Sequence, residues 1–158
     1  MTDIDYILEL FDWNKSEQEQ KKGLELASSV KCLNAFLQPG FPYGKRVWKN
    51  CAKVVASKND DILSYFIFDL FDWIEDLNWP GALIILDRLK TFSGKMLLTG
   101  FMEKYNWAVS LNTEEGLMLL DNLSELLDNK SLKEKLPTEI IETLEKHYHN
   151  PGYWYTDT

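Results

Sequence analysis

The segment between residues 70 and 82 constrains the possible fold more strongly than any other part of this 158-residue chain. Its sequence, LFDWIEDLNWPGA, begins with an apolar helical run that ends at a tryptophan and continues as an acidic turn. Pro80 then stands where a second helix would start, and Asn78 or Trp79 is expected to cap that helix. The letters LFDW also occur at residues 10–13. The segment therefore predicts a helical hairpin that is repeated along the chain, rather than an enzyme pocket.

Apolar residues recur at helical spacing through almost the whole chain. The sequence predicts helices over 4–11, 16–27, 30–37, 46–57, 60–74, 80–89, 93–110 and 113–127, and a last helix after Pro137. Ser16 and Glu19 form the capping-box pattern that starts the second of them, and Asn59 is expected to cap the fifth. The 60–74 helix is apolar on more than one face, so we expect it to be central and buried. Convincing strand patterns are missing, and the predicted fold class is all-α.

Tryptophans and small residues recur in a way that suggests stacked hairpins. Trp48, Trp79 and Trp107 are spaced by about 30 residues, a period typical of helical repeats. A small residue follows each of them, which would let helices approach closely beside the bulky ring: Ala52, Ala82 and Ala108. The pattern predicts a short HEAT-like helical-hairpin solenoid in two layers. The alternative is that the tryptophans are scattered by chance.

We expect one domain over residues 1–158. It would consist of an N-terminal helical extension (1–44), a helical core that carries the 70–82 segment (45–128), and a C-terminal helix with an aromatic tail (129–158). The tail residues Tyr153, Trp154 and Tyr155 are expected to fold back onto the last helix, because exposed aromatic clusters promote aggregation.

The charge and composition exclude several classes of function. The formal net charge is −8, and such a surface repels the phosphates of nucleic acids. It would suit a basic protein partner, although many soluble proteins are equally acidic.

The longest apolar stretch, 62–74, is too short and too charged to cross a membrane. The acidic start of the chain is unlike a secretory signal. Cys32 and Cys51 are expected to be buried thiols, with a disulfide as the alternative, and we expect a cytoplasmic protein.

The sequence offers no constellation that predicts catalysis. The only histidines, His147 and His149, would point to different faces of a helix, and we expect both to be exposed at its frayed end. A third metal ligand is missing nearby in sequence, and the cysteine spacing fits no zinc pattern. The chain also lacks a glycine-rich phosphate loop. We therefore expect a protein that is not an enzyme, without metal or cofactor.

Acidic residues around the central hairpin are the candidate binding residues. They form either a solvated rim or a patch that docks a positively charged partner. Trp79 either packs between hairpins or anchors an interface, where tryptophan is over-represented. The candidate partner-binding residues are Asp60, Asp61, Asp72, Glu75, Asp76 and Trp79.

The run WIEDLNWPGA at residues 73–82 resembles the hallmark WLQDMNWPxA of a small bacterial α-helical family. The chain departs from that hallmark at Ile74, Glu75 and Leu77, all mild changes. Helical, acidic, single-domain proteins of this kind are similar to immunity proteins of bacterial polymorphic toxin systems. The resemblance implies that the chain binds and neutralises a cognate toxin protein in the cytoplasm. It brings no catalytic or binding residues with it. The alternative is a helical-repeat adaptor whose protein or peptide partner is unrelated to toxins; the oligomeric state stays open.

Overall fold

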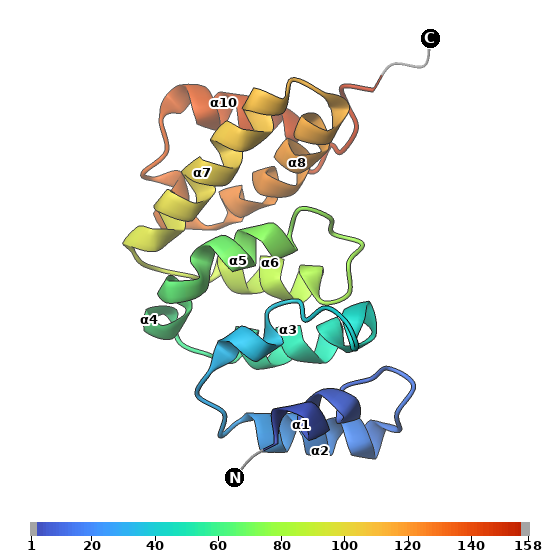
Figure 1. The fold of residues 1–158 in the computed structure, drawn as a ribbon. Coiled ribbons are helices and arrows are strands. Elements are labelled where there is room, and N and C mark those ends of the chain that lie inside the picture. The colour runs from blue at the N-terminus through green and yellow to red at the C-terminus, as the bar shows by residue number, and fades with distance from the viewer. Residues whose placement is uncertain (1–2, 156–158) are drawn as a thin grey trace.

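The computed structural model describes residues 3–155, and within them every regular element is helical, which confirms the predicted all-α fold (Figure 1). The α-helices are α1 (Ile4–Leu10), α2 (Glu17–Ala27), α3 (Trp48–Ala56), α4 (Asp60–Leu63), α5 (Ile67–Trp73), α6 (Ala82–Lys90), α7 (Lys95–Leu111), α8 (Glu114–Ser124), α9 (Lys130–Lys133) and α10 (Thr138–His147). Short 3₁₀ helices link them: η1 (Leu33–Phe36), η2 (Gly44–Val47), η3 (Ser64–Phe66) and η4 (Glu125–Asp128).

The helices stack along one direction, from α1 and α2 at one end to α7, α8 and α10 at the other (Figure 1). In one layer α2 contacts α3, α3 contacts α6, and α6 contacts η4. In the other layer α5 contacts α7. The pairs α1–α2, α5–α6 and α7–α8 connect the two layers, and α10 closes the stack by packing on α8 and η4. A single hydrophobic cluster extends from Ile7 to Leu144 through all of these elements.

Local capping explains where several helices start. Ser16 and Glu19 form the predicted capping box, in which each side chain bonds the other residue's backbone amide. Asn59 accepts a hydrogen bond from the Ile62 amide at 2.9 Å and starts α4, as the sequence predicted. These caps satisfy amides that a helix itself leaves without partners.

Two predicted helices are shorter than their apolar patterns suggested. The 60–74 helix is divided into α4, η3 and α5, because the backbone leaves the α-helical path at Phe66 (φ −119°, ψ 16°). Serine and aromatic residues in this stretch have modest helix propensity, so packing decides its path. The 30–37 helix is reduced to η1, because Leu37 leaves the helical path with φ −88° and ψ 84°. Gln38, the next residue, has a φ of +48°. Cys32 lies at the start of η1 and is exposed, so the prediction that it is buried is wrong.

The start of α6 also differs from the prediction that Asn78 or Trp79 caps it. The helix begins at Ala82, and Gly81 at its N-cap has a left-handed backbone with φ of +84°. Pro80 lies before the helix, and its carbonyl accepts a hydrogen bond from the Trp73 indole at 3.0 Å. The 74–81 turn is therefore folded back onto α5 rather than continuing directly into α6.

Tryptophan rings hold this turn against α3. Trp48 of α3 makes edge-on contacts with Trp73, at a centroid distance of 6.3 Å, and with Trp79, at 5.9 Å. Gly81 lies so close to α3 that an added Cβ would be 2.6 Å from the Cβ of Ala52. The prediction that Ala52 lets another segment approach closely beside Trp48 is confirmed here. The residue that approaches Ala52 is Gly81, which precedes α6.

The two LFDW strings have corresponding environments. Phe11 and Phe71 are fully buried, and each packs on a glycine of another helix, Gly23 for Phe11 and Gly100 for Phe71. The aspartates that follow both bind a cation: Asp12 binds Arg46 at 2.7 Å and Asp72 binds Lys104 at 2.6 Å. The tryptophans differ, because Trp13 is 57% exposed while Trp73 is fully buried.

The C-terminal region is more ordered than the histidine pattern suggested. His147 is only 2% exposed, and its Nδ1 lies 2.7 Å from a carboxylate oxygen of Asp121, so its predicted exposure is wrong. Asp121 also accepts hydrogen bonds from the Gly152 amide and the Trp154 indole. The tail therefore folds back in part: Trp154 is held on α8, and Tyr153 packs edge-on against His147 of α10. Tyr153 and Tyr155 remain 43% and 60% exposed, so the prediction that the fold-back covers the tail aromatics is wrong for these two residues.

Across residues 3–155, none of the helices combines the length and apolar character that a bilayer crossing requires.

Replacing Gly81 tests how far the fold depends on the approach of the turn to α3. We expect Gly81→Ala to lower the free energy of unfolding by about 2 kcal/mol or more, because alanine is strained at positive φ and its Cβ would clash with Ala52 and the Trp48 carbonyl. Urea unfolding followed by tryptophan fluorescence measures the change. Gly40→Ala is the control, since Gly40 has an open environment among the described residues. Equal stability of the two variants would contradict the prediction.

Candidate functional site

A groove opens between the 75–79 turn and the α7–α8 hairpin. Its volume is about 430 Å³. The residues that line it are Glu75, Asp76, Leu77, Asn78, Trp79, Trp107, Leu111, Glu115, Met118, Leu119 and Asn122. We call it the acidic–aromatic groove, because its lining combines carboxylates with large apolar side chains.

Large apolar side chains of the groove remain accessible. Trp107 is 46% exposed and Met118 is 57% exposed. Trp79 is half-buried, because one side of its ring packs on Trp48. Exposed tryptophan and methionine side chains that lie beside carboxylates are more typical of a binding surface than of a solvated rim.

The carboxylates of the groove are only partly neutralised. Within residues 3–155, neither Asp76 nor Glu115 forms an ion pair, and no lysine or arginine belongs to the lining. One oxygen of Asp76 accepts a hydrogen bond from the Asn78 amide at 2.9 Å, which fixes the direction of this side chain. Asp76 and Glu115 thus present negative charge that no ion pair balances among the described residues. Glu75 is paired with Lys104, and the ammonium of Lys45 lies 5.8 Å from the centroid of the Trp79 ring.

Asn122 of α8 determines where the turn lies. Its side-chain amide donates hydrogen bonds to the carbonyls of Ile74 and Glu75, both at 3.0 Å. These carbonyls follow the end of α5 and would otherwise need water as a partner. The turn and α8, which form opposite sides of the groove, are therefore joined directly.

Lys104 of α7 binds the remaining acids beside the groove. Its ammonium lies 2.6 Å from both Asp72 and Glu75, and its side chain is only 11% exposed. It also lies 5.0 Å from the centroid of the Trp107 ring, within cation–π distance. Burial by itself lowers the pKa of Lys104, but the hydrogen bonds and charges of Asp72 and Glu75 outweigh burial and raise it overall.

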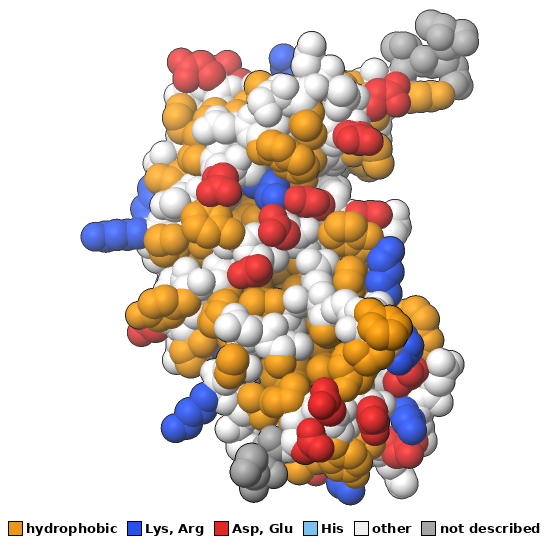
Figure 2. Space-filling model, viewed as in Figure 1, with side chains coloured by type: hydrophobic (Ala, Val, Ile, Leu, Met, Phe, Trp, Pro, Cys, Tyr) orange, Lys and Arg blue, Asp and Glu red, His pale blue; other side chains and the backbone are white. Residues whose placement is uncertain are grey.

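The structure brings together some of the sequence-predicted candidates and separates others. Glu75, Asp76 and Trp79 line the groove, and Asp72 lies beside it through Lys104. Figure 2 shows acidic side chains gathered over the junction of α5 and α7, among hydrophobic ones. Asp60 and Asp61 belong to α4 and are not among the groove residues.

Asp60 has an internal structural role. Its carboxylate binds Arg88 at 2.6 Å and accepts hydrogen bonds from the amide and hydroxyl of Ser93. Burial alone would raise the pKa of Asp60, but these partners lower it overall. Asp60 therefore joins α4 to α6 and to the turn after α6. Both of its carboxylate oxygens already have partners within the chain, so few acceptor sites remain for a second protein. Asp61 is exposed in the first turn of α4.

Sequence reasoning missed Glu115, Trp107 and Met118 as groove residues. Trp107 was noticed through its spacing from Trp79, but that spacing predicted packing between hairpins rather than exposure. The signal that could have identified it is that Glu103, Lys104 and Ser110 share its helix face, since such polar neighbours are unusual on a buried face.

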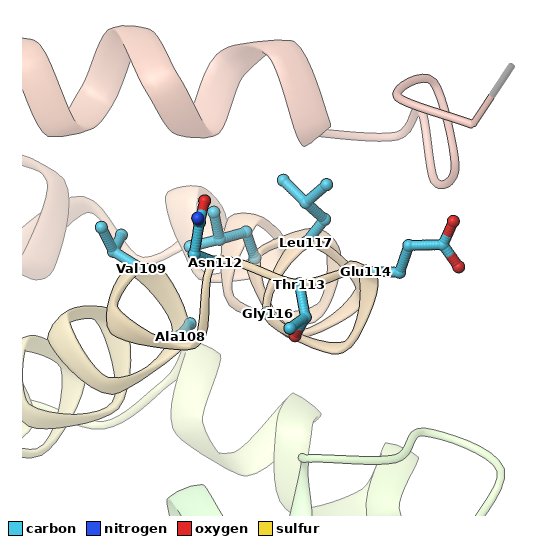
Figure 3. A pocket seen from close by; sticks show the side chains of 8 residues that line it. Ala108, Val109, Asn112, Thr113, Glu114, Gly116 and Leu117 are labelled. Carbon is cyan, nitrogen blue, oxygen red and sulfur yellow. The ribbon is translucent and has the colours of Figure 1, made fainter.

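A second hollow, of about 520 Å³, lies at the turn between α7 and α8. Figure 3 shows Asn112 and Leu117 on the side of this hollow that faces α10, whereas Glu114 points away along the end of α8. Its lining is small or aliphatic apart from Asn112, Thr113 and Glu114, so it lacks the combination of aromatic rings and several carboxylates found in the acidic–aromatic groove.

A further cluster could in principle hold a metal ion. Oxygens of Glu125 and Asp128 and a ring nitrogen of His149 lie within 4.8 Å of one another. The ammonium of Lys90 lies 3.7 Å from Glu125 and 3.2 Å from Asp128, and it already supplies positive charge to both. His149 is 63% exposed. We interpret the cluster as a surface ion-pair network around Lys90.

Comparisons with protein-family models, curated proteins and solved structures found no match to this chain. The interpretation of the groove therefore rests on its own chemistry.

The charge of Lys104 should make a pH-dependent contribution to stability. We expect Lys104→Met to lower the free energy of unfolding by about 1 kcal/mol near neutral pH, because it leaves Asp72 and Glu75 without their cation. A raised lysine pKa gives a contribution that is complete below the ordinary value of about 10.4 and disappears as pH rises through the folded-state value. The difference between the variant and the wild type should therefore shrink at alkaline pH.

Urea unfolding at a series of pH values measures this difference. Lys95→Met, at an exposed position on the first turn of the same helix, serves as the control and should show little effect at any pH. A difference for Lys104→Met that stays constant, or grows, as lysines deprotonate would contradict the assigned role.

Proposed function

We propose that this protein is an immunity protein, which binds a cognate bacterial toxin protein and neutralises it by contact. The resemblance of residues 73–82 to the hallmark of a bacterial helical family supports this proposal. The acidic–aromatic groove supports it independently, since it offers a surface suited to a basic protein. Neutralisation then requires only that the complex covers or distorts the toxin's active region.

The observation that carries the proposal is the unbalanced charge beside exposed aromatic rings. Asp76 and Glu115 are unpaired within the described residues, and Trp107 is 46% exposed between them and Lys104. Interface centres are enriched in tryptophan, and complementary charge speeds the encounter of two proteins. The net charge of −8 would add to the attraction of a basic toxin.

A second candidate function is a helical-repeat adaptor whose partner is unrelated to toxins. The stacking of the α1–α2, α5–α6 and α7–α8 pairs favours it, because stacked pairs present extended surfaces to partner proteins. Both candidates use protein binding without a chemical step. The identity of the neighbouring gene product distinguishes them, since an immunity protein is expected to be encoded beside its toxin.

Co-expression with the neighbouring gene product tests the proposal. We expect the two proteins to co-purify and the cells to survive expression of the toxin. Absence of both co-purification and protection would refute the immunity role, while co-purification with a harmless neighbour would favour the adaptor.

Charge reversal tests whether the groove forms the interface. We expect Asp76→Lys combined with Glu115→Lys to weaken toxin binding roughly tenfold or more, mainly through slower association. The matched control combines Glu142→Lys with Glu114→Lys, which changes the net charge equally at exposed positions outside the groove. Surface plasmon resonance gives the association rates. Equal losses in the two double variants would show that overall charge, rather than this groove, governs binding.

A further inference from the structure

We infer that the acidic–aromatic groove receives a single basic side chain, an arginine presented by a surface segment of the partner protein. This inference rests on the proposed function in requiring a protein partner, but it does not require that the partner is a toxin. The groove is suited to such a guest because its lining combines tryptophan rings with unpaired carboxylates.

Lys104 shows how this surface holds a cation. Its ammonium contacts two carboxylates at 2.6 Å and lies 5.0 Å from the centroid of the Trp107 ring. Lys104, Glu75 and Trp107 line a smaller hollow, together with Glu103. Glu75 and Trp107 also line the acidic–aromatic groove, so the two hollows adjoin. In the first hollow Lys104 pairs with Glu75. In the second, Lys45 lies 5.8 Å from the centroid of the Trp79 ring, but Asp76 and Glu115 have no ion-pair partner among the described residues.

The chemistry of the groove favours arginine as the guest. A guanidinium group is planar, so it can lie against the exposed part of the Trp107 ring while its N–H groups donate to a carboxylate. Asp76 and Glu115 supply acceptors from the turn and from α8 respectively. Leu111 and Met118 provide apolar surface for the aliphatic part of the arginine side chain. Trp107, Glu115 and Met118 are exposed, whereas Asp76 and Leu111 are partly exposed.

The groove is held in shape before any partner arrives. Asn122 fixes the turn to α8 through the Ile74 and Glu75 carbonyls, and Trp79 is held by its edge-on contact with Trp48. A preformed site loses less conformational entropy when it binds. Binding of an arginine should therefore be detectable even with a short peptide.

A peptide titration tests this inference without the toxin. The probe is the blocked peptide acetyl-Gly-Arg-Gly-amide, and the readout is the indole N–H signals of the tryptophans in ¹H–¹⁵N NMR spectra. We expect saturable shifts at Trp79 and Trp107, whereas Trp13, which is 57% exposed outside the groove, should respond weakly. The neutral peptide acetyl-Gly-Gln-Gly-amide should give no saturable shift at any of them.

Neutral variants then assign the carboxylates. We expect Asp76→Asn combined with Glu115→Gln to weaken binding of the arginine peptide about tenfold, which corresponds to about 1.4 kcal/mol. The matched control is Glu142→Gln combined with Glu114→Gln, and it should bind the peptide as the wild type does.

Three outcomes would overturn the inference: equal responses to the arginine and glutamine peptides, shifts confined to tryptophans outside the groove, or equal loss of binding in the two double variants. Failure of the peptide to bind the groove would leave toxin binding at another surface open to the co-expression experiment. Peptide binding in the groove, with no neighbouring toxin bound, would instead refute the immunity role and keep the arginine site.

Discussion

The close contact of the 74–81 turn with α3 is the interaction on which the rest of the structure depends. Gly81 approaches Ala52 and the Trp48 carbonyl so closely that no larger residue fits without movement. This approach brings Trp79 against Trp48, and it sets the point from which α6 starts toward η4. Because the same turn forms one side of the acidic–aromatic groove, the packing that joins successive helical pairs also positions the candidate site.

Asparagine side chains form a second kind of connection between successive parts of the stack. Asn50 of α3 donates to the carbonyl of Phe11 after α1, and Asn122 of α8 donates to carbonyls that follow α5. Asn129 donates to the carbonyls of Leu89 and Phe92 around the end of α6. Each amide satisfies carbonyls that a helix end leaves without intrahelical partners. A hydrophobic contact alone would allow helices to slide, whereas these hydrogen bonds favour one relative position.

The sequence predicted what depends on neighbouring residues and missed what depends on distant ones. Helical spacing and the caps at Ser16 and Asn59 are local, and they were predicted correctly. The break at Phe66 and the start of α6 at Ala82 were not, because packing against other elements decides them. For the site, acidity and Trp79 were readable from the sequence. The sequence did not show that Asp60 is paired with Arg88. It also did not show that Glu115 and Trp107 line the groove, because both lie on helices far from Trp79 in sequence.

The distribution of paired and unpaired acids has a physical consequence for function. Asp12, Asp60 and Asp72 each bind a cation of another element, so their charges contribute to holding the stack together. Asp76 and Glu115 make no such ion pair within residues 3–155, although both line the acidic–aromatic groove. One set of acids therefore helps to hold the stack together, and a different set gives the groove its charge. In the proposed complex, only the second set could bind a basic partner without breaking an ion pair that joins two elements of the stack.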